Sequence, residues 1–393
     1  MSHKFRAQKE IIEKYYLGKK KGGIIGHEDA VPSVDRFVSK VEDKTLTPTS
    51  DHIHFNISII NNSDTESIPA TYESNLTQPI LDNPSDFYAT VERFNVPTYT
   101  VPLFAFVDNT YSVCLTYLGV DYFAYVPFIN GSTLANPNQE VFGYQIFIDM
   151  VNSALSTAWT ALITAESKAP GATGSPPTII LDPVSDLCTL IATQGAFTPD
   201  NAVGTTIYMN GPLFKFFNSL QNIFNGYGTV NGKDFTIVVK NDFNNFIPIG
   251  PAGSGGGTGT FPIANSWGMV QETTTLFNWS QLQSIVFTTT MIPVQKEYIP
   301  QPSFISAPDG SINFRPILTD FQPTVGTDPF DFSNVQYTPT VYRWVDLQGT
   351  IPLDKMDLQI WWSDQGNNLF PLRLAPSAIA SIKLQFRRRG IED

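Results

Sequence analysis

The chain is poor in cysteine, histidine and charge. Its 393 residues include two cysteines, Cys114 and Cys188, and four histidines. Two cysteines without metal-site spacing exclude a disulfide framework and indicate folding in a reducing compartment. Only 15% of the residues are charged, whereas ordinary soluble domains have roughly 25%. So few charges are typical of a surface covered by other subunits, although a surface of Asn, Gln, Ser and Thr is the alternative.

Long apolar runs are also missing. No segment reaches the roughly 18 apolar residues of a membrane span, so we expect none. Residues 1–21 are basic and polar and lack the apolar centre of a signal peptide. The hydrophobic content of 42% and the aromatic content of 13% exclude a disordered chain and suffice for one large or two medium cores.

Motifs for catalysis and metal binding are scarce. His52 and His54 form an H-x-H pair, but no acid or cysteine completes a metal site. Residues 251–260 are glycine-rich but lack the Gly-Lys-[Ser/Thr] of a phosphate-binding loop, which favours a flexible loop. Nucleophile-elbow and H-E-x-x-H motifs are absent as well. We therefore expect no cofactor, no metal and no enzymatic activity.

Carboxylates near two tryptophans keep two alternatives open. A β-sandwich glycosidase needs two carboxyls on facing elements, and the candidates are Asp320, Asp328, Asp331, Asp354, Asp357 and Asp364. Aspartate beside proline is also ordinary turn chemistry. Trp361 and Trp362, if exposed, could instead line the sugar site of a receptor- or glycan-binding spike protein.

Charge is segregated along the chain. Residues 22–382 contain 13 Lys or Arg against 32 Asp or Glu. The terminal cations are candidates for contact with a subunit or a polyanion: Lys4, Arg6, Lys9, Lys14, Lys19, Lys20, Lys21, Arg387, Arg388 and Arg389. A basic arm on an acidic body is typical of a coat protein whose arm meets a polyanion or an acidic neighbour. Both partners stay open for the arm, and subunit carboxylates are favoured for the three arginines.

Short segments of alternating hydrophobicity dominate the rest of the sequence. Residues 52–59 place Ile53, Phe55, Ile57 and Ile59 on one face, and residues 381–386 repeat this pattern. Many such segments between Pro and Gly turns predict a mainly β fold, a jelly-roll sandwich. Helical spacing predicts a short amphipathic helix over residues 5–17 and two helices, over residues 144–165 and 212–224, within an inserted α+β segment.

These patterns divide the chain into four parts. Residues 1–44 form a basic N-terminal arm and linker, and residues 45–135 supply the first jelly-roll strands. Residues 136–262 form the α+β insertion with the glycine-rich loop, and residues 263–393 supply the remaining strands.

Three stretches give the chain a resemblance to a known group of proteins: residues 80–106, 144–155 with 178–192, and 353–388. They resemble an early strand pair with a Pro-marked corner, a helix followed by a hairpin, and closing strands with basic residues. Together they are similar to the penton (minor capsid) proteins of polinton-like viruses and virophages.

The resemblance implies a jelly-roll capsid subunit that self-assembles at the vertices of an icosahedral shell. It implies a homo-oligomer, with a pentamer favoured and a trimer possible, in contact with other capsid proteins. The protein would be assembled inside the host cell and located in the virion, where the basic arm could reach the viral genome. A major capsid protein with two jelly rolls that forms trimers remains an alternative.

Overall fold

The computed structural model describes residues 52–130, 136–165, 174–198, 204–240, 266–298, 314–323 and 334–390. The predicted basic arm and the glycine-rich loop lie outside these residues. The described part has two large clusters of buried side chains, each built around its own sheets.

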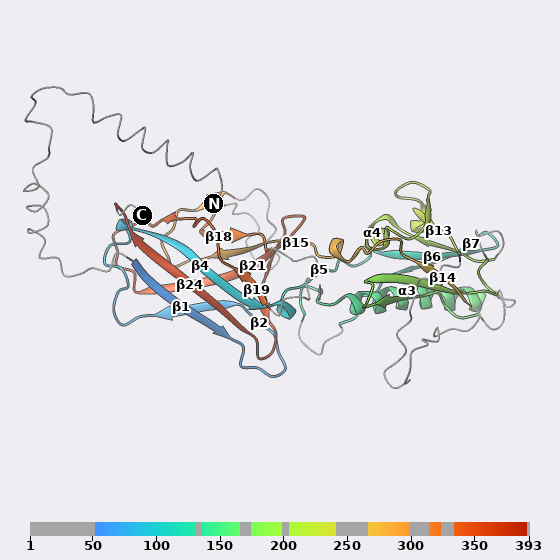
Figure 1. Cartoon of the computed structure of the whole chain (residues 1–393), viewed down its shortest axis with the longest axis horizontal. Helices are drawn as coiled ribbons and strands as arrows, with labels where there is room; N and C mark the ends of the chain where they lie inside the picture. The colour runs from blue at the N-terminus through green and yellow to red at the C-terminus, as the bar shows by residue number, and fades with distance from the viewer. Residues whose placement is uncertain are drawn as a thin grey trace, which may run out of the picture. The chain divides into compact units, whose positions relative to one another are not determined.

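The first sheet of the jelly roll joins the two ends of the described chain. Its order is β1 (His52–Ile60), β24 (Ile379–Arg388), β4 (Phe87–Pro97) and β19 (Asn334–Tyr337), all antiparallel, and β20 (Val345–Asp346) also pairs with β4. Figure 1 shows β1, β24 and β4 side by side. Ile57, Ile59, Ile382 and Phe386 are buried, which confirms the alternation predicted for both segments.

The second sheet has the order β18 (Ile317–Phe321), β15 (Leu282–Thr288), β21 (Lys355–Asp364) and β22 (Leu369–Pro371), and β3 (Thr71–Asn75) also pairs with β21. Side chains of both sheets meet in one buried cluster, where the Phe94 and Phe287 rings lie 5.1 Å apart. Two antiparallel sheets with first and last strands paired form a jelly-roll sandwich, as predicted.

Short strand pairs connect the larger elements. They are β2 (Ile68–Pro69) with β23 (Arg373–Leu374), β5 (Phe104–Ala105) with β8 (Glu140–Val141), and β16 (Glu297–Tyr298) with β17 (Phe314–Arg315).

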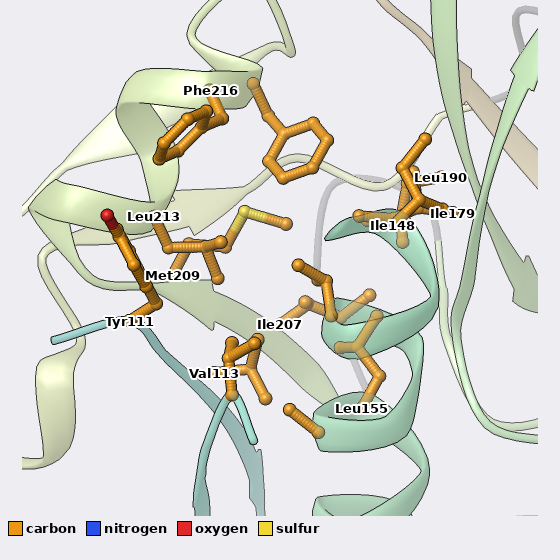
Figure 2. Close-up of a cluster of buried hydrophobic side chains, with 14 of the residues drawn as sticks. Tyr111, Val113, Ile148, Leu155, Ile179, Leu190, Ile207, Met209, Leu213 and Phe216 are labelled. Carbon is orange, nitrogen blue, oxygen red and sulfur yellow. The ribbon is translucent and has the colours of Figure 1, made fainter. Parts of the chain in front are cut away.

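Between β4 and β15 the chain builds a unit with its own core. Its larger sheet has the order β12 (Asn222–Phe224), β13 (Phe235–Ile237), β11 (Thr206–Met209), β6 (Ser112–Tyr117) and β7 (Val120–Tyr125). A smaller sheet has the order β14 (Ser266–Val270), β10 (Leu187–Thr193) and β9 (Thr178–Asp182). Figure 2 shows side chains of both sheets and of the helix α3 in one apolar cluster.

The helix α3 spans Tyr144–Ala165, the range predicted from its spacing. Ile148, Val151, Leu155 and Leu162 are fully buried, because the helix packs against β6, β7 and β9. By length and composition alone α3 could also cross a membrane. Its burial against two sheets is typical of the core helix of a folded unit.

The helix predicted over residues 212–224 is wrong in extent. Only α4 (Gly211–Phe214) and a 3-10 turn (Lys215–Phe217) are helical, and residues 222–224 form β12. Asn210 caps the start through its Oδ1, which accepts from Leu213 N at 3.2 Å. Pairing of Phe224 with Phe235 in the sheet overrides the helical spacing of the last residues.

Two further segments contain only short strands. Only Phe104–Ala105 is a strand within residues 101–107, and only Val345–Asp346 within residues 341–347.

The domain boundaries predicted at residues 44, 135 and 262 stay predictions. Side chains of β6, such as Val113 and Leu115, lie in the same cluster as those of α3.

Candidate subunit-contact surface

The candidate contact residues fall into two groups. The cations of residues 1–21 lie outside the described residues. Arg387, Arg388 and Arg389 lie at the end of β24, where Phe386 is the last fully buried side chain of the strand.

The arginines at this strand end already bind their own chain. Arg389 Nη2 lies 2.9 Å from Asp346 Oδ1 and donates to Leu347 O at 3.1 Å. Its guanidinium also lies 5.0 Å from the centre of the Tyr88 ring. These contacts hold the Arg389 side chain in place and compensate part of its charge, although Arg389 stays exposed to solvent.

Arg387 lies over an aromatic ring. Its guanidinium carbon is 4.4 Å from the centre of the Trp344 ring, a distance at which cation–π attraction is significant. Arg388 is partly exposed and lies opposite Phe87 of β4. The role of the three arginines in subunit contact stays a prediction.

A network of polar side chains covers the outer face of the same sheet. Lys383 Nζ lies 2.7 Å from Glu92 Oε1, and His54 Nδ1 lies 3.1 Å from Glu92 Oε2. The ring of His52 lies 2.9 Å from Gln385 Nε2. The H-x-H pair therefore lies in a hydrogen-bonded strand face. Among the residues that the structure describes, no group of three potential His, Cys, Asp or Glu ligands is found.

Asp357 is a structural cap. Its Oδ1 accepts from Thr289 Oγ1 at 2.7 Å and from Met291 N at 2.8 Å, and its two oxygens accept from Thr290 N at 2.8 and 3.0 Å. The side chain is buried. The carboxylate therefore holds the turn that follows β15 through hydrogen bonds to three successive residues.

Two other candidate acids are also bound locally, whereas Asp354 is exposed. Asp364 accepts from Asn368 N at 2.8 Å and from Asn368 Nδ2 at 2.9 Å. Asp320 pairs with Arg343 at 2.5 Å, and the other side of that guanidinium binds Glu297. Asp328 and Asp331 lie outside the described residues.

The tryptophans do not form an exposed sugar platform. Trp362 is fully buried, stacks on Phe370 at 4.5 Å and donates from Nε1 to Glu140 Oε1 at 2.8 Å. Trp361 is partly exposed and donates to Thr288 Oγ1 at 2.8 Å. The glycan-binding alternative requires both rings to be exposed, and Trp362 does not meet this condition because its side of β21 faces the sandwich core.

Glu140 is a buried carboxyl that sequence reasoning missed. Only 3% of its surface is exposed. Burial raises its pKa, although the Trp362 hydrogen bond and the charge of Arg373 oppose the shift. No sequence pattern marks this residue, because its partners come from distant strands.

Neither cysteine is a suitable nucleophile. Burial raises the pKa of Cys114 to about 11 and that of Cys188 to about 12, so both thiols stay protonated and unreactive at neutral pH.

Exposed apolar side chains gather beside β12 in the inserted unit. Tyr227 is 78% exposed and Phe224 is 52% exposed, with ring centres 4.9 Å apart. Asp234 holds the chain just after Tyr227, since its carboxylate accepts from Thr229 N and Gly211 N. Sequence reasoning missed this patch because residues 212–224 were assigned to one amphipathic helix.

The sequence profile of the Sputnik minor capsid protein V18/19 family matches residues 53–388 of this chain. Structural protein V19 of the Sputnik virophage is 30% identical over 211 residues, which are 53% of this chain and 93% of the relative. The uncharacterized protein V18 of the same virophage is 30% identical over 122 residues, which are 24% of this chain and 73% of that relative.

Solved structures agree with this match. A chain in the cryo-EM structure of the Sputnik virophage has a TM-score of 0.64 at 27% identity, over 86% of this chain and 98% of that chain. The crystal structure of the mavirus penton protein has a TM-score of 0.57 at 19% identity, over 86% of this chain and 99% of that chain. At that identity the second likeness concerns the fold alone.

Proposed function

Because this chain belongs to the Sputnik minor capsid protein V18/19 family and is a structural protein of the virion, we propose that it is the penton subunit of an icosahedral shell. Five copies would join around each vertex through their jelly rolls. The single observation that carries the proposal is the family match over residues 53–388, which covers the sandwich and the inserted unit together.

The fold supports a penton subunit over a major capsid protein. The described residues contain a single jelly-roll sandwich, and the unit inserted between β4 and β15 has a helix packed on its sheets. A subunit with two jelly rolls side by side would require a second sandwich in place of that unit.

We further propose that the role is mechanical and involves no catalysis. Asp357 and Asp364 cap turns, Asp320 forms an ion pair, and both thiols are buried. The low charge content of 15% suits a subunit whose exterior is largely covered by neighbours.

The basic arm, residues 1–21, would contact a neighbouring subunit or the genome. Its charge favours either an acidic protein surface or nucleic acid phosphates. The variant with Lys19, Lys20 and Lys21 changed to Gln separates these partners. Loss of assembly indicates a subunit contact, whereas assembly without retained DNA indicates a genome contact.

Particle mass tests the proposal. Mass photometry and negative-stain images of the purified full chain should show particles of about five times the 43.5 kDa chain mass. Particles of three times that mass would contradict the pentamer but keep self-assembly. A monomer at high concentration would overturn the proposal.

A further inference from the structure

Glu140 lies where the inserted unit joins the jelly roll. The chain leaves the jelly roll after β4 and re-enters it at β15. Between these strands, Leu103 N donates to Val141 O and Gln281 N donates to Leu103 O, both at 2.7 Å. The strand β8, which contains Glu140, is therefore tied to both connecting segments. We call this part of the chain the junction; it consists of residues 103–105, 140–141 and 281.

The Glu140 carboxyl connects two separate cores. Its neighbour Val141 is buried in the cluster of the inserted unit, whereas Trp362 is buried in the cluster of the jelly roll. Trp362 Nε1 donates to Glu140 Oε1 at 2.8 Å. Another side-chain contact between these parts, from Lys215 Nζ to Gln365 Oε1, is exposed and measures 3.4 Å. A buried hydrogen bond to a titratable group thus fastens β8 to β21.

The groups around Glu140 compensate its charge only in part. Burial raises the pKa of the carboxyl, and this effect outweighs the opposing effects of Trp362 on β21, Arg373 on β23 and Asn138 before β8. Trp362 and Asn138 are neutral donors, so Arg373 is the charged member of this set. Its guanidinium is held by Ser67, since Nε donates to Ser67 Oγ at 3.1 Å and Nη2 donates to Ser67 O at 2.7 Å.

The protonation state of Glu140 changes what the chain gains by opening the junction. A neutral carboxyl is buried at modest cost, whereas a carboxylate gains hydration when β8 separates from β21. Opening therefore becomes easier as pH rises from the ordinary value of 4.5 through the raised pKa of the closed state, and levels off above it. Acid favours the closed junction.

We propose that Glu140 is a pH-sensitive latch, which fastens the inserted unit to the jelly roll in acid and loosens at neutral pH. The contact between β8 and β21 is the element with two states, and the charge of one side chain biases them. The latch lies within one chain, so it operates in a monomer as well as in an oligomer and goes beyond the proposed function.

Single-molecule fluorescence energy transfer in the full chain tests the latch. Ile60→Cys in the jelly roll and Val230→Cys in the inserted unit attach pH-insensitive dyes at positions that are 48% and 77% exposed. Cys114 and Cys188 are buried and stay unlabelled. Excess unlabelled chain limits each oligomer to one pair of dyes. The population of open chains should rise several-fold from pH 4.5 to neutral pH.

Three variants separate Glu140 from other titrating groups. Glu140→Gln keeps an acceptor for Trp362 and removes the charge, so its open population should stay at the low acid value at every pH. Glu73→Gln makes the same change at an exposed position of β3 and should keep the wild-type dependence on pH. Arg373→Gln removes the compensating charge and should enlarge the open population at neutral pH. Circular dichroism and the thermal midpoint check that every variant folds.

Each outcome decides for or against the latch. A wild-type open population that is independent of pH, or that grows in acid, overturns it. A Glu140→Gln chain that opens with pH as the wild type does also overturns it, because another group would then titrate. If Glu140→Gln fails to fold, an Arg373→Gln population equal to that of the wild type rejects the latch. Oligomer mass tests the proposed function separately.

Discussion

Replacing Asp357 should destabilise the jelly roll because its carboxylate closes the turn that follows β15. The side chain accepts from two backbone N–H groups, Thr290 N and Met291 N, and from the hydroxyls of Thr289 and Thr290. In Asp357→Ala the two partly buried N–H groups lose their acceptor. Each such loss costs about 1–3 kcal/mol, so we expect a loss of about 3–5 kcal/mol in the free energy of unfolding.

Asp357→Asn separates the hydrogen bonds from the charge. The amide oxygen can still accept from both backbone N–H groups, and the Thr290 hydroxyl can rotate to accept from the amide nitrogen. Only the strengthening by the charge is lost, which predicts about 1–2 kcal/mol. Asp354→Ala, at an exposed position three residues earlier, is the control and should change stability by at most about 0.5 kcal/mol.

Urea unfolding followed by tryptophan fluorescence measures the three variants. Equal effects of the Ala and Asn substitutions, or a loss under about 1 kcal/mol for Asp357→Ala, would refute the cap as the reason for this carboxylate. A glycosidase would behave differently, since Asp357→Asn would then remove turnover on polysaccharides from a fully stable protein.

Three further predictions concern buried or partly buried groups. Cys114 and Cys188 should react with a maleimide at neutral pH only after unfolding, because their pKa values are about 11 and 12; rapid labelling of the native chain would contradict their burial. The raised pKa of Glu140 means that its contribution to stability is present below the ordinary value of 4.5 and is lost as pH rises through the folded pKa. Glu140→Gln keeps an acceptor for Trp362 and should flatten the dependence of the urea midpoint on pH. If the urea midpoint of this variant depends on pH as strongly as that of the wild type, the raised pKa of Glu140 is contradicted. Asn210→Ala removes the cap of α4 and should cost about 1–2 kcal/mol by urea unfolding, whereas a neutral result would show that the cap is dispensable.

Local periodicity predicted the elements that bury one regular face. Residues 52–59 and 382–386 alternate as strands, and residues 144–165 form the long helix, because each segment repeats its apolar residues at the period of its own backbone. The segment 212–224 misled the same reasoning. Its spacing fits a helix, but the pairing of β12 with β13 decides the conformation of its last three residues.

The candidate site was less accessible to sequence reasoning. The three arginines at the end of β24 were found from their type and clustering, yet their partners Trp344 and Asp346 come from a segment about forty residues earlier. From the sequence, Trp362 was a candidate for an exposed ring near Asp364, whereas the sandwich buries it fully. Alternation identifies two faces of a strand but does not say which of them meets the other sheet.

The sequence by itself determined the mainly β class, the long helix and the separation of basic termini from an acidic body, since each depends on residues close together in the chain or on composition alone. Only the tertiary structure decided that His52–Ile60 pairs with the last strand, that Asp357 caps a turn and that Trp362 lies in the core of the sandwich. Those features join residues far apart in the sequence, such as His52 and Arg387, which are 335 positions apart, and the shared core that brings them together is formed by the whole fold.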